Sequence, residues 1–178
     1  MRKDIRIAGS GGQGVITLSM ILAEAYGVFE DLEVSQTQSY GPEARGGFCR
    51  AELVVSDKEI DYVKVDEVDI FIAFNETGFK RYSGDIRPET VIFANSTLIS
   101  EEVLEPYKGN VIYSIPATEI AEEKFKVVMA NIVMLGFMIT KFENMSYESA
   151  EKAVRKSVPP GRLEENLQAL RHGYDLGA

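Results

Sequence analysis

The sequence Ile5-Arg6-Ile7-Ala8-Gly9-Ser10-Gly11-Gly12-Gln13-Gly14 joins a short apolar run to a glycine-rich loop. After the loop, apolar residues recur at helical spacing between Val15 and Phe29. We therefore predict a strand, a glycine loop and a helix, which is a common opening of an α/β domain. Residues without a Cβ allow a tight turn there and let backbone N–H groups approach a ligand at the start of the helix.

The loop lacks parts that two nucleotide-binding classes require. Gly9, Gly11 and Gly14 match the dinucleotide pattern G-x-G-x-x-G, but Ser35-Gln36 ends the second predicted strand, where a ribose-binding acid is expected. Val15-Ile16 follows Gly14 in place of the Lys-Ser/Thr pair of a triphosphate loop. Anion binding at the helix N-terminus and close packing against another chain both stay open. The candidate cofactor-binding or anion-binding residues are Gly9, Gly11, Gly12, Gln13 and Gly14.

The segment after the first helix alternates between strand and loop patterns. Residues 32–35 can form a second strand, and the polar residues 36–47 are expected to form a loop. Apolar and polar residues alternate over 48–55, and Ser56-Asp57-Lys58 offers a turn into residues 60–62. We therefore expect an antiparallel hairpin from 48 to 62.

Three continuous apolar runs follow, at 68–74, 91–94 and 111–115. Such runs are typical of parallel strands that are covered on both faces, so helices should cross between them. Pro116 ends the last run because proline cannot donate to a sheet, and Thr118 is expected to cap the next helix.

The carboxyl-terminal part of the chain is predicted to be helical. Residues 131–140 are apolar on nearly all sides and should be buried, and Ser146 can cap a helix over 147–156. Leu163, Leu167 and Leu170 form a last apolar stripe. We expect a single domain over residues 1–178: an α/β fold with a mixed, largely parallel sheet, flanking helices, a Rossmann-like glycine loop and an antiparallel hairpin.

Composition narrows the classes of partner. The 178 residues are 45% hydrophobic and 26% charged, which are ordinary globular values, and the formal net charge is −9. That charge disfavours nucleic acid and anionic membranes, whose binding depends on Lys and Arg. No window approaches the roughly 20 apolar residues of a membrane span, and the start of the chain has no signal-peptide pattern. We expect a cytoplasmic location.

A second unusual segment is Thr37-Gln38-Ser39-Tyr40-Gly41-Pro42-Glu43-Ala44-Arg45-Gly46-Gly47. Loops at the carboxyl edge of an open α/β sheet line the functional crevice, so we expect it to lie near the glycine loop. Together the two segments resemble the gamma subunits of 2-oxoacid:ferredoxin oxidoreductases, and the second is most similar to the 2-oxoglutarate branch. The resemblance continues through residues 56–62, the Asn131 helix and residues 166–173.

This resemblance implies a chain without cofactors of its own. In the family, thiamine diphosphate and its magnesium ion lie between alpha and beta subunits, and iron–sulfur clusters are held by beta or delta chains. The single cysteine agrees, because a cluster needs several thiolates. The implied partners are alpha, beta and, where present, delta subunits, with ferredoxin reached through the complex and CoA and a 2-oxoacid as substrates. We assign no catalytic or metal-binding residue to this chain.

The second segment supplies the interface candidates, which are Tyr40, Gly41, Pro42, Glu43, Arg45, Gly46 and Gly47. Arg45 either pairs with Glu43 on an exposed loop or reaches a carboxylate or phosphate at a subunit junction. Tyr40 either anchors an interface or packs over its own turn. Cys49 shares a face with apolar residues and should be buried, and His172 has no neighbours for catalysis.

The leading hypothesis is a gamma subunit of an enzyme that converts 2-oxoglutarate, CoA and oxidised ferredoxin to succinyl-CoA, CO2 and reduced ferredoxin. The chain alone should be inactive and should contribute to assembly and to a contact for CoA or another anion. Two alternatives stay open because fold does not fix function. One is a stand-alone NAD(P)-dependent oxidoreductase, and the other is a ligand-binding assembly module unrelated to oxoacid chemistry.

Overall fold

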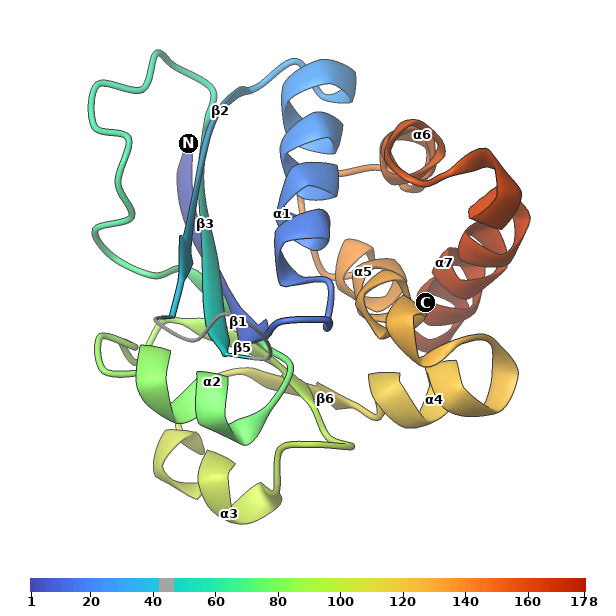
Figure 1. The fold of residues 1–178 in the computed structure, drawn as a ribbon. Coiled ribbons are helices and arrows are strands. Elements are labelled where there is room, and N and C mark those ends of the chain that lie inside the picture. Colours follow the sequence, from blue (N-terminus) through green and yellow to red (C-terminus); the bar gives the residue numbers. More distant parts are fainter. Residues whose placement is uncertain (42–46) are drawn as a thin grey trace.

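The computed structural model describes residues 1–41 and 47–178. Within them, six strands form one sheet in the order β2-β3-β1-β4-β5-β6 (Figure 1). β1 pairs in parallel with β4, β4 with β5, and β5 with β6, whereas β3 runs antiparallel to both β1 and β2. The predicted mixed, largely parallel sheet is therefore confirmed. The strands are β1 (Arg2–Ser10), β2 (Glu33–Tyr40), β3 (Phe48–Ser56), β4 (Ile70–Ala73), β5 (Val91–Asn95) and β6 (Ile112–Ile115).

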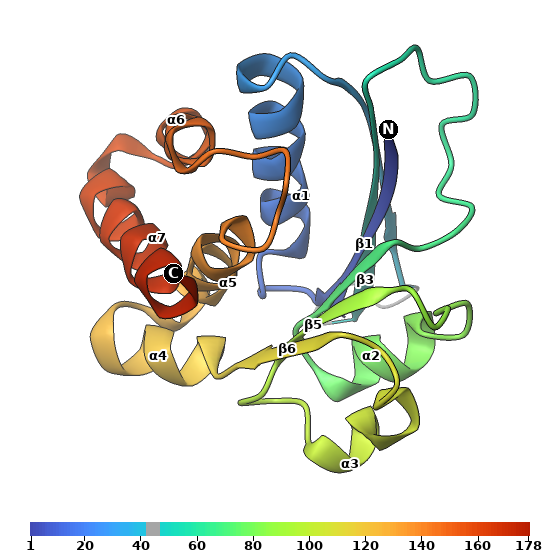
Figure 2. The same cartoon turned by 180° about the vertical axis from the view of Figure 1, so that it is seen from behind.

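Helices cover both faces of the sheet (Figures 1 and 2). The first one continues into a turn of π-helix, and short 3-10 turns precede α5 and α7. The α-helices are α1 (Val15–Glu24), α2 (Glu76–Tyr82), α3 (Glu101–Leu104), α4 (Ala117–Lys124), α5 (Ala130–Ile139), α6 (Tyr147–Ser157) and α7 (Leu163–Gly177). The shorter turns are η1 (Ala25–Phe29), η2 (Glu105–Tyr107), η3 (Val127–Met129) and η4 (Pro160–Arg162).

Successive residues of the central strands face two separate cores, because side chains alternate across a strand. Ile72 and Phe93 point into a large core that holds α1, α5, α6 and α7. Phe71 and Ile92 point into a smaller core beneath α2 and α3. The continuous apolar runs of β4 and β5 are explained by this burial on both faces.

Helix α5 lies inside the larger core, as the sequence predicted. Its residues from Ala130 to Gly136 are all buried. Gly136 and Gly173 allow α5 and α7 to pack with their backbones in contact, because a Cβ on Gly136 would lie 2.1 Å from the Leu170 carbonyl oxygen. The predicted cap of α6 is also confirmed, since the Ser146 hydroxyl accepts a hydrogen bond from the Ser149 N–H.

The antiparallel hairpin exists, but its predicted position was wrong. Residues 36–40 continue β2 instead of starting a loop, and Tyr40 lies opposite Cys49 in the register with β3. Polar side chains suit β2 because it is the edge strand, which needs backbone pairing but little apolar surface. Residues 60–62 form no strand, since β1 and β2 already occupy both edges of β3.

The predicted cap at Thr118 was also wrong. Helix α4 begins two residues earlier than that cap predicts, with Pro116 at the N-cap position and no side-chain cap. The Thr118 hydroxyl is used instead as an acceptor for the Asn95 side-chain amide, at 2.8 Å. Asn95 is fully buried at the end of β5, and its amide needs that acceptor.

Candidate functional site

The glycine loop begins where β1 and α2 come into close contact. A Cβ on Gly78, in the first turn of α2, would lie 2.9 Å from the Gly9 backbone nitrogen. A Cβ on Gly9 itself would lie 2.8 Å from a methyl group of Val15. Gly9 therefore serves strand-to-helix packing, which is the structural role considered for it from the sequence.

Two glycines of the loop need positive φ angles. Gly12 has φ of +89° and Gly14 has φ of +74°, a region that is strained for residues with a Cβ. Gly14 is the N-cap residue of α1, and it provides no side chain to cap the helix. The N–H groups at the start of an α-helix have no partner within the helix, so they can serve a ligand.

The Gln13 side chain stabilises the glycine loop through hydrogen bonds to the loop backbone and to Asn75. Its side-chain oxygen accepts hydrogen bonds from the Ser10 N–H at 2.8 Å and from the Asn75 amide at 3.0 Å. The Asn75 amide also donates to the Ser10 hydroxyl at 2.6 Å, while its oxygen caps α2 by accepting from the Gly78 N–H. Gln13 is therefore occupied in holding the turn. Asn75 was missed by sequence reasoning, because it lies 62 positions from Gln13.

A second helix N-terminus meets the loop from the carboxyl-terminal half of the chain. Asn131, in the first turn of α5, is 4% exposed, and its amide donates to the Gly14 carbonyl at 3.2 Å. A Cβ on Gly14 would lie only 2.3 Å from that amide nitrogen. Gly14 is thus required by its own backbone angle and by the approach of α5.

These elements surround a groove of about 410 Å³, here named the glycine groove. It is lined by the loop and the start of α1 (residues 10–12 and 14–17, without Gln13), by residues 128, 129, 131 and 132 around the start of α5, and by Arg162 with Asn166 at the start of α7. Arg162 is the N-cap residue of α7, so residues at the starts of α1, α5 and α7 all line the groove, although the first N–H groups of α5 and α7 already donate to the Val127 and Pro160 carbonyls of the preceding 3-10 turns. Each helix start contributes partial positive charge.

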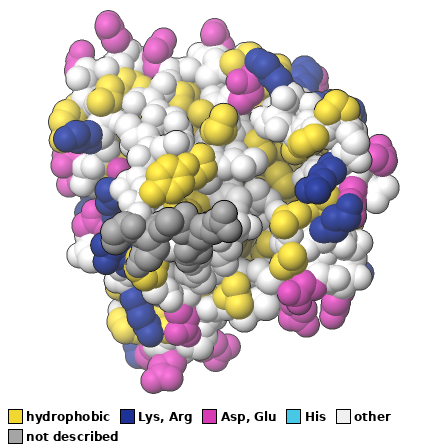
Figure 3. Space-filling model, in the orientation of Figure 1, with side chains coloured by type: hydrophobic (Ala, Val, Ile, Leu, Met, Phe, Trp, Pro, Cys, Tyr) yellow, Lys and Arg dark blue, Asp and Glu magenta, His cyan; other side chains and the backbone are white. Residues whose placement is uncertain are grey.

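The charge of the glycine groove differs from that of the whole chain. Arg162 is the one charged side chain among the described lining residues, although the chain carries a net charge of −9. Arg162 is exposed, so its guanidinium can reach an incoming group. Figure 3 shows one face of the molecule on which hydrophobic side chains gather around the middle and Asp and Glu lie mostly toward the outline. A carboxylate or phosphate fits the groove better than a cation does.

The second segment meets the glycine loop, as expected. The Gly11 N–H donates to the Gly47 carbonyl at 2.9 Å, and the Gly41 N–H donates to the Phe48 carbonyl at 2.7 Å. Tyr40 lines the glycine groove and is 65% exposed, so most of its ring is free to contact another molecule. The predictions for Pro42, Glu43, Arg45 and Gly46 fall on residues 42–46, outside the described part of the chain.

Two remaining sequence candidates have structural roles. Cys49 is 4% exposed, and burial raises the pKa of its thiol, so the reactive thiolate is disfavoured. His172 packs edge-on against Phe125, with 5.9 Å between the ring centres. Within the described residues no cluster of His, Cys, Asp and Glu is suited to hold a metal ion, and no helix there is long and apolar enough to span a membrane. The cytoplasmic location stays a prediction.

Comparisons with known proteins point to one family. The family model described as pyruvate ferredoxin/flavodoxin oxidoreductase matches residues 4–176. The 2-oxoglutarate synthase subunit KorC of Methanocaldococcus jannaschii is 42% identical over 177 residues, which are 99% of this chain and 94% of that protein. The crystal structure of a keto/oxoacid ferredoxin oxidoreductase gamma subunit from Geobacter sulfurreducens PCA matches with a TM-score of 0.81 and 30% identity, covering 98% of each chain.

A further structure adds ligands to this comparison. The 2-oxoglutarate:ferredoxin oxidoreductase from Magnetococcus marinus, solved with 2-oxoglutarate, coenzyme A and succinyl-CoA bound, matches with a TM-score of 0.87 and 26% identity. That match covers 99% of this chain and 31% of the other, so the present fold corresponds to one part of a longer chain there.

The chain therefore belongs to the pyruvate ferredoxin/flavodoxin oxidoreductase family. Within this family of oxidoreductases it is a gamma-type subunit, similar over nearly its whole length to KorC and to the Geobacter gamma subunit. The resemblance seen in the two loop segments is confirmed.

Proposed function

We propose that this chain is the gamma subunit of a 2-oxoglutarate:ferredoxin oxidoreductase and that residues 1–178 act as one gamma domain. The complete enzyme would convert 2-oxoglutarate, CoA and oxidised ferredoxin to succinyl-CoA, CO2 and reduced ferredoxin. Support comes from the 42% identity to a KorC subunit over nearly the full length of both proteins. In this proposal thiamine diphosphate and magnesium belong to the alpha and beta partners and iron–sulfur clusters to beta or delta chains; the single cysteine of this chain supports only the last point, because a cluster needs several thiolates.

Within that enzyme, the glycine groove receives an anionic part of CoA. The observation that carries this role is the convergence of three helix N-termini and Arg162 on a groove whose described lining has no carboxylate. CoA carries phosphate groups, which helix N-termini and arginine bind well. Apolar residues such as Val128 and Ile132 line the same groove and suit the uncharged parts of such a molecule.

Charge reversal of Arg162 in the assembled enzyme tests this role. Loss of one charge-assisted hydrogen bond costs about 1.5 to 3 kcal/mol, so Arg162→Glu should weaken CoA binding at least tenfold. The KM for 2-oxoglutarate should stay the same. Isothermal titration with CoA gives the affinity, and Lys124→Glu, on the exposed end of α4, makes the same charge change outside the groove. Unchanged CoA affinity in Arg162→Glu would refute the assignment.

The same titration of Arg45→Glu tests the second segment. If Arg45 reaches the anion, CoA affinity should fall as it does for Arg162→Glu; if Arg45 only pairs with Glu43, the affinity should not change. This comparison addresses a residue outside the described part of the chain.

Two other functions make different predictions. A stand-alone NAD(P)-dependent oxidoreductase needs an acid for the ribose hydroxyls, and the described lining of the glycine groove contains no Asp or Glu. The purified chain should therefore leave NADH fluorescence unchanged at micromolar concentration. A pure assembly module would form the complex normally while Arg162→Glu and Lys124→Glu bind CoA with equal affinity. Mass spectrometry of the native complex, finding thiamine-enzyme and ferredoxin-like partners, tests the assembly itself.

A further inference from the structure

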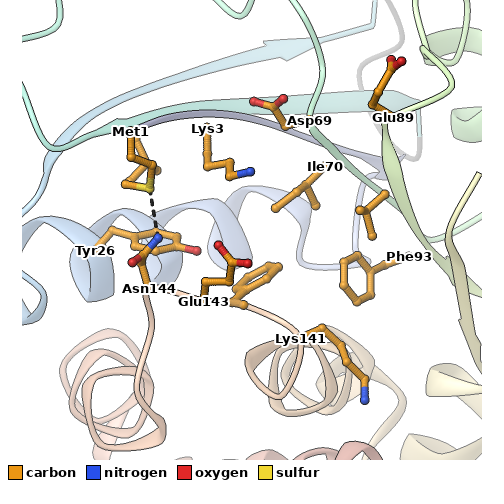
Figure 4. Close-up of a pocket in the computed structure, with 13 residues that line it drawn as sticks. Met1, Lys3, Tyr26, Asp69, Ile70, Glu89, Phe93, Lys141, Glu143 and Asn144 are labelled. Carbon is orange, nitrogen blue, oxygen red and sulfur yellow. Dashed lines mark hydrogen bonds between the residues drawn. The ribbon is translucent and has the colours of Figure 1, made fainter.

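A second cavity lies at the amino-terminal edge of the sheet, the edge opposite to the glycine loop. It encloses about 290 Å³ between the starts of β1, β4 and β5 and the segment that joins α5 to α6 (Figure 4). This volume is near the lower end of those of small-molecule sites, which run from roughly 300 to 1,000 Å³. We call it the amino-edge pocket. Its lining residues include Lys3, Tyr26, Ile70, Phe93, Phe142 and Glu143.

The inner surface of the pocket is aromatic and aliphatic. Phe93 and Phe142 stand edge to face at 5.8 Å between ring centres, and Phe142 also packs against Tyr26 at 6.4 Å. Ile70 completes this surface from β4. Aromatic rings bind other rings in tilted or offset arrangements, so these walls suit a single flat ring.

One polar atom on this inner surface lacks a partner within the protein. Tyr26 is 6% exposed, and its hydroxyl makes no hydrogen bond with any residue that the structure describes. Figure 4 shows the Tyr26 oxygen directed toward the other lining side chains. The Tyr26 oxygen is not among the fully buried atoms without a partner, so it is open to the pocket and can exchange a water molecule for the hydroxyl of a ligand. Burial, with Glu30 nearby, raises the pKa of Tyr26, so the hydroxyl keeps its proton.

Two opposite charges stand at the mouth of the pocket without an ion pair to each other. Lys3 and Glu143 are both exposed, and Figure 4 shows the Lys3 nitrogen and the Glu143 carboxylate turned toward the pocket. Neither forms a salt bridge with a described residue. Lys141 differs, because its ammonium group donates to the Gly177 carbonyl at 2.9 Å and lies over the Tyr113 ring. Lys3 is therefore the cation available to a ligand in the mouth, and Glu143 is an available anion together with Glu89, which is likewise exposed and forms no salt bridge with a described residue.

We propose that the amino-edge pocket binds a small aromatic amino acid whose ring carries a hydroxyl group. Its ring would pack against Phe93 and Phe142, and the ring hydroxyl would pair with Tyr26. Its ammonium group would meet Glu143, and its carboxylate would meet Lys3. The pocket shares no lining residue with the glycine groove, so this inference is independent of the proposed CoA contact.

Three probes separate the parts of this recognition. L-Tyrosine carries every group, L-phenylalanine lacks the ring hydroxyl, and tyramine lacks the carboxylate. Methyl NMR spectra of the full chain should show saturable shifts of Ile70 and Val91, which line the pocket, when L-tyrosine is added. L-Phenylalanine should bind about fivefold more weakly for one lost neutral hydrogen bond, and tyramine about two- to fivefold more weakly for one lost exposed ion pair.

Conservative variants complete the test as thermodynamic cycles. Tyr26→Phe should remove the difference between L-tyrosine and L-phenylalanine, and Lys3→Gln should remove the difference between L-tyrosine and tyramine. Glu143→Gln should weaken all three probes, whereas Glu123→Gln, on the exposed face of α4, should weaken none. Two results would overturn the proposal: no saturable shift up to 2 mM L-tyrosine, or equal affinities for the three probes in the unchanged chain.

Discussion

The glycine groove and the amino-edge pocket lie at opposite edges of the sheet and differ in the residues that line them. The glycine groove combines the glycines at positions 11, 12 and 14 with residues at the starts of α1, α5 and α7 and one exposed arginine. The amino-edge pocket is formed by side chains, with aromatic rings inside and separate charges at its mouth. Backbone donors recognise an anion of almost any shape, whereas packed rings select a shape. The two proposed sites of this sheet therefore differ in what they would select: an anion in the glycine groove, and a ring of fitting shape in the amino-edge pocket.

The largest effect is expected when an aromatic wall of the amino-edge pocket is removed. Phe93 is 1% exposed and stacks on Tyr113 with 5.2 Å between ring centres. Phe93→Ala should lower the free energy of unfolding by about 4 kcal/mol, measured by urea denaturation, because it leaves a cavity. Phe93→Leu keeps most of the volume and should cost clearly less. Equal losses in the two variants would mean that packing does not define this pocket.

The substitution Gly14→Ala tests whether the backbone conformation of the glycine groove requires glycine. The substitution forces a Cβ into positive φ, at about 1 to 2 kcal/mol, and into contact with Asn131. The free energy of unfolding should fall by about 3 kcal/mol in total, as crowding adds its own cost. Gly109→Ala is the matched control, because its Cβ would meet no atom within 4 Å. A Gly14→Ala chain as stable as Gly109→Ala would contradict the role of this backbone.

Two substitutions of Asn75 test its two roles separately: the N-cap of α2 and the hydrogen bonds that hold the glycine loop. Asn75→Ala loses both functions and should destabilise the chain by about 1 to 2 kcal/mol in thermal or urea unfolding. Asn75→Asp keeps the oxygen that accepts from Gly78 but loses the donor to Ser10 and Gln13. Asn75→Asp should therefore weaken CoA binding by the complex, while its free energy of unfolding should fall less than that of Asn75→Ala. Loss of stability alone in Asn75→Asp would show that the loop needs no fastening.

The smallest effect concerns Glu30, which joins η1 to the start of α6. Burial alone would raise the pKa of Glu30, but hydrogen bonds from the Ser146 N–H and from the Ser149 and Ser146 hydroxyls outweigh it and lower the pKa. Its stabilising contribution is therefore present above the unfolded pKa of about 4.3 and is lost as pH falls through the lower folded value. The stability difference between the unchanged chain and Glu30→Gln should shrink between pH 6 and 3.

A control decides whether this pH dependence belongs to Glu30. Glu123→Gln removes an exposed carboxylate from α4, away from Ser146. Its stability difference from the unchanged chain should stay nearly flat over the same pH range. If Glu30→Gln and Glu123→Gln give the same profile, the hydrogen bonds to Ser146 do not stabilise the fold.

The same contrast between backbone and side chains explains what the sequence could reveal. The strand, loop and helix around Gly9 to Gly14 were predicted because glycines at fixed offsets mark backbone that must turn. The buried α5 was predicted from its apolar composition. The extension of β2 through Tyr40 was missed, because an edge strand is specified by hydrogen bonds to β3 that leave no apolar pattern.

The partners of the two hollows lie too far apart in sequence to be predicted. Asn75, Asn131 and Arg162 reach the glycine loop or its groove from three separate elements. The amino-edge pocket combines residues from positions 1 to 144, and no local spacing relates them. Local patterns report periodicity and turns, whereas these neighbours are fixed only when the whole sheet and its helices pack.

The hydrogen bond between Asn131 and Gly14 joins positions 117 residues apart. During synthesis, the amino-terminal half could form β1 and its loop, but the groove has no second wall until α5 and the start of α7 have left the ribosome. A ligand or partner that needs both walls therefore cannot engage a nascent or truncated chain. The groove thus exists only once the start of α7 has joined the amino-terminal loop.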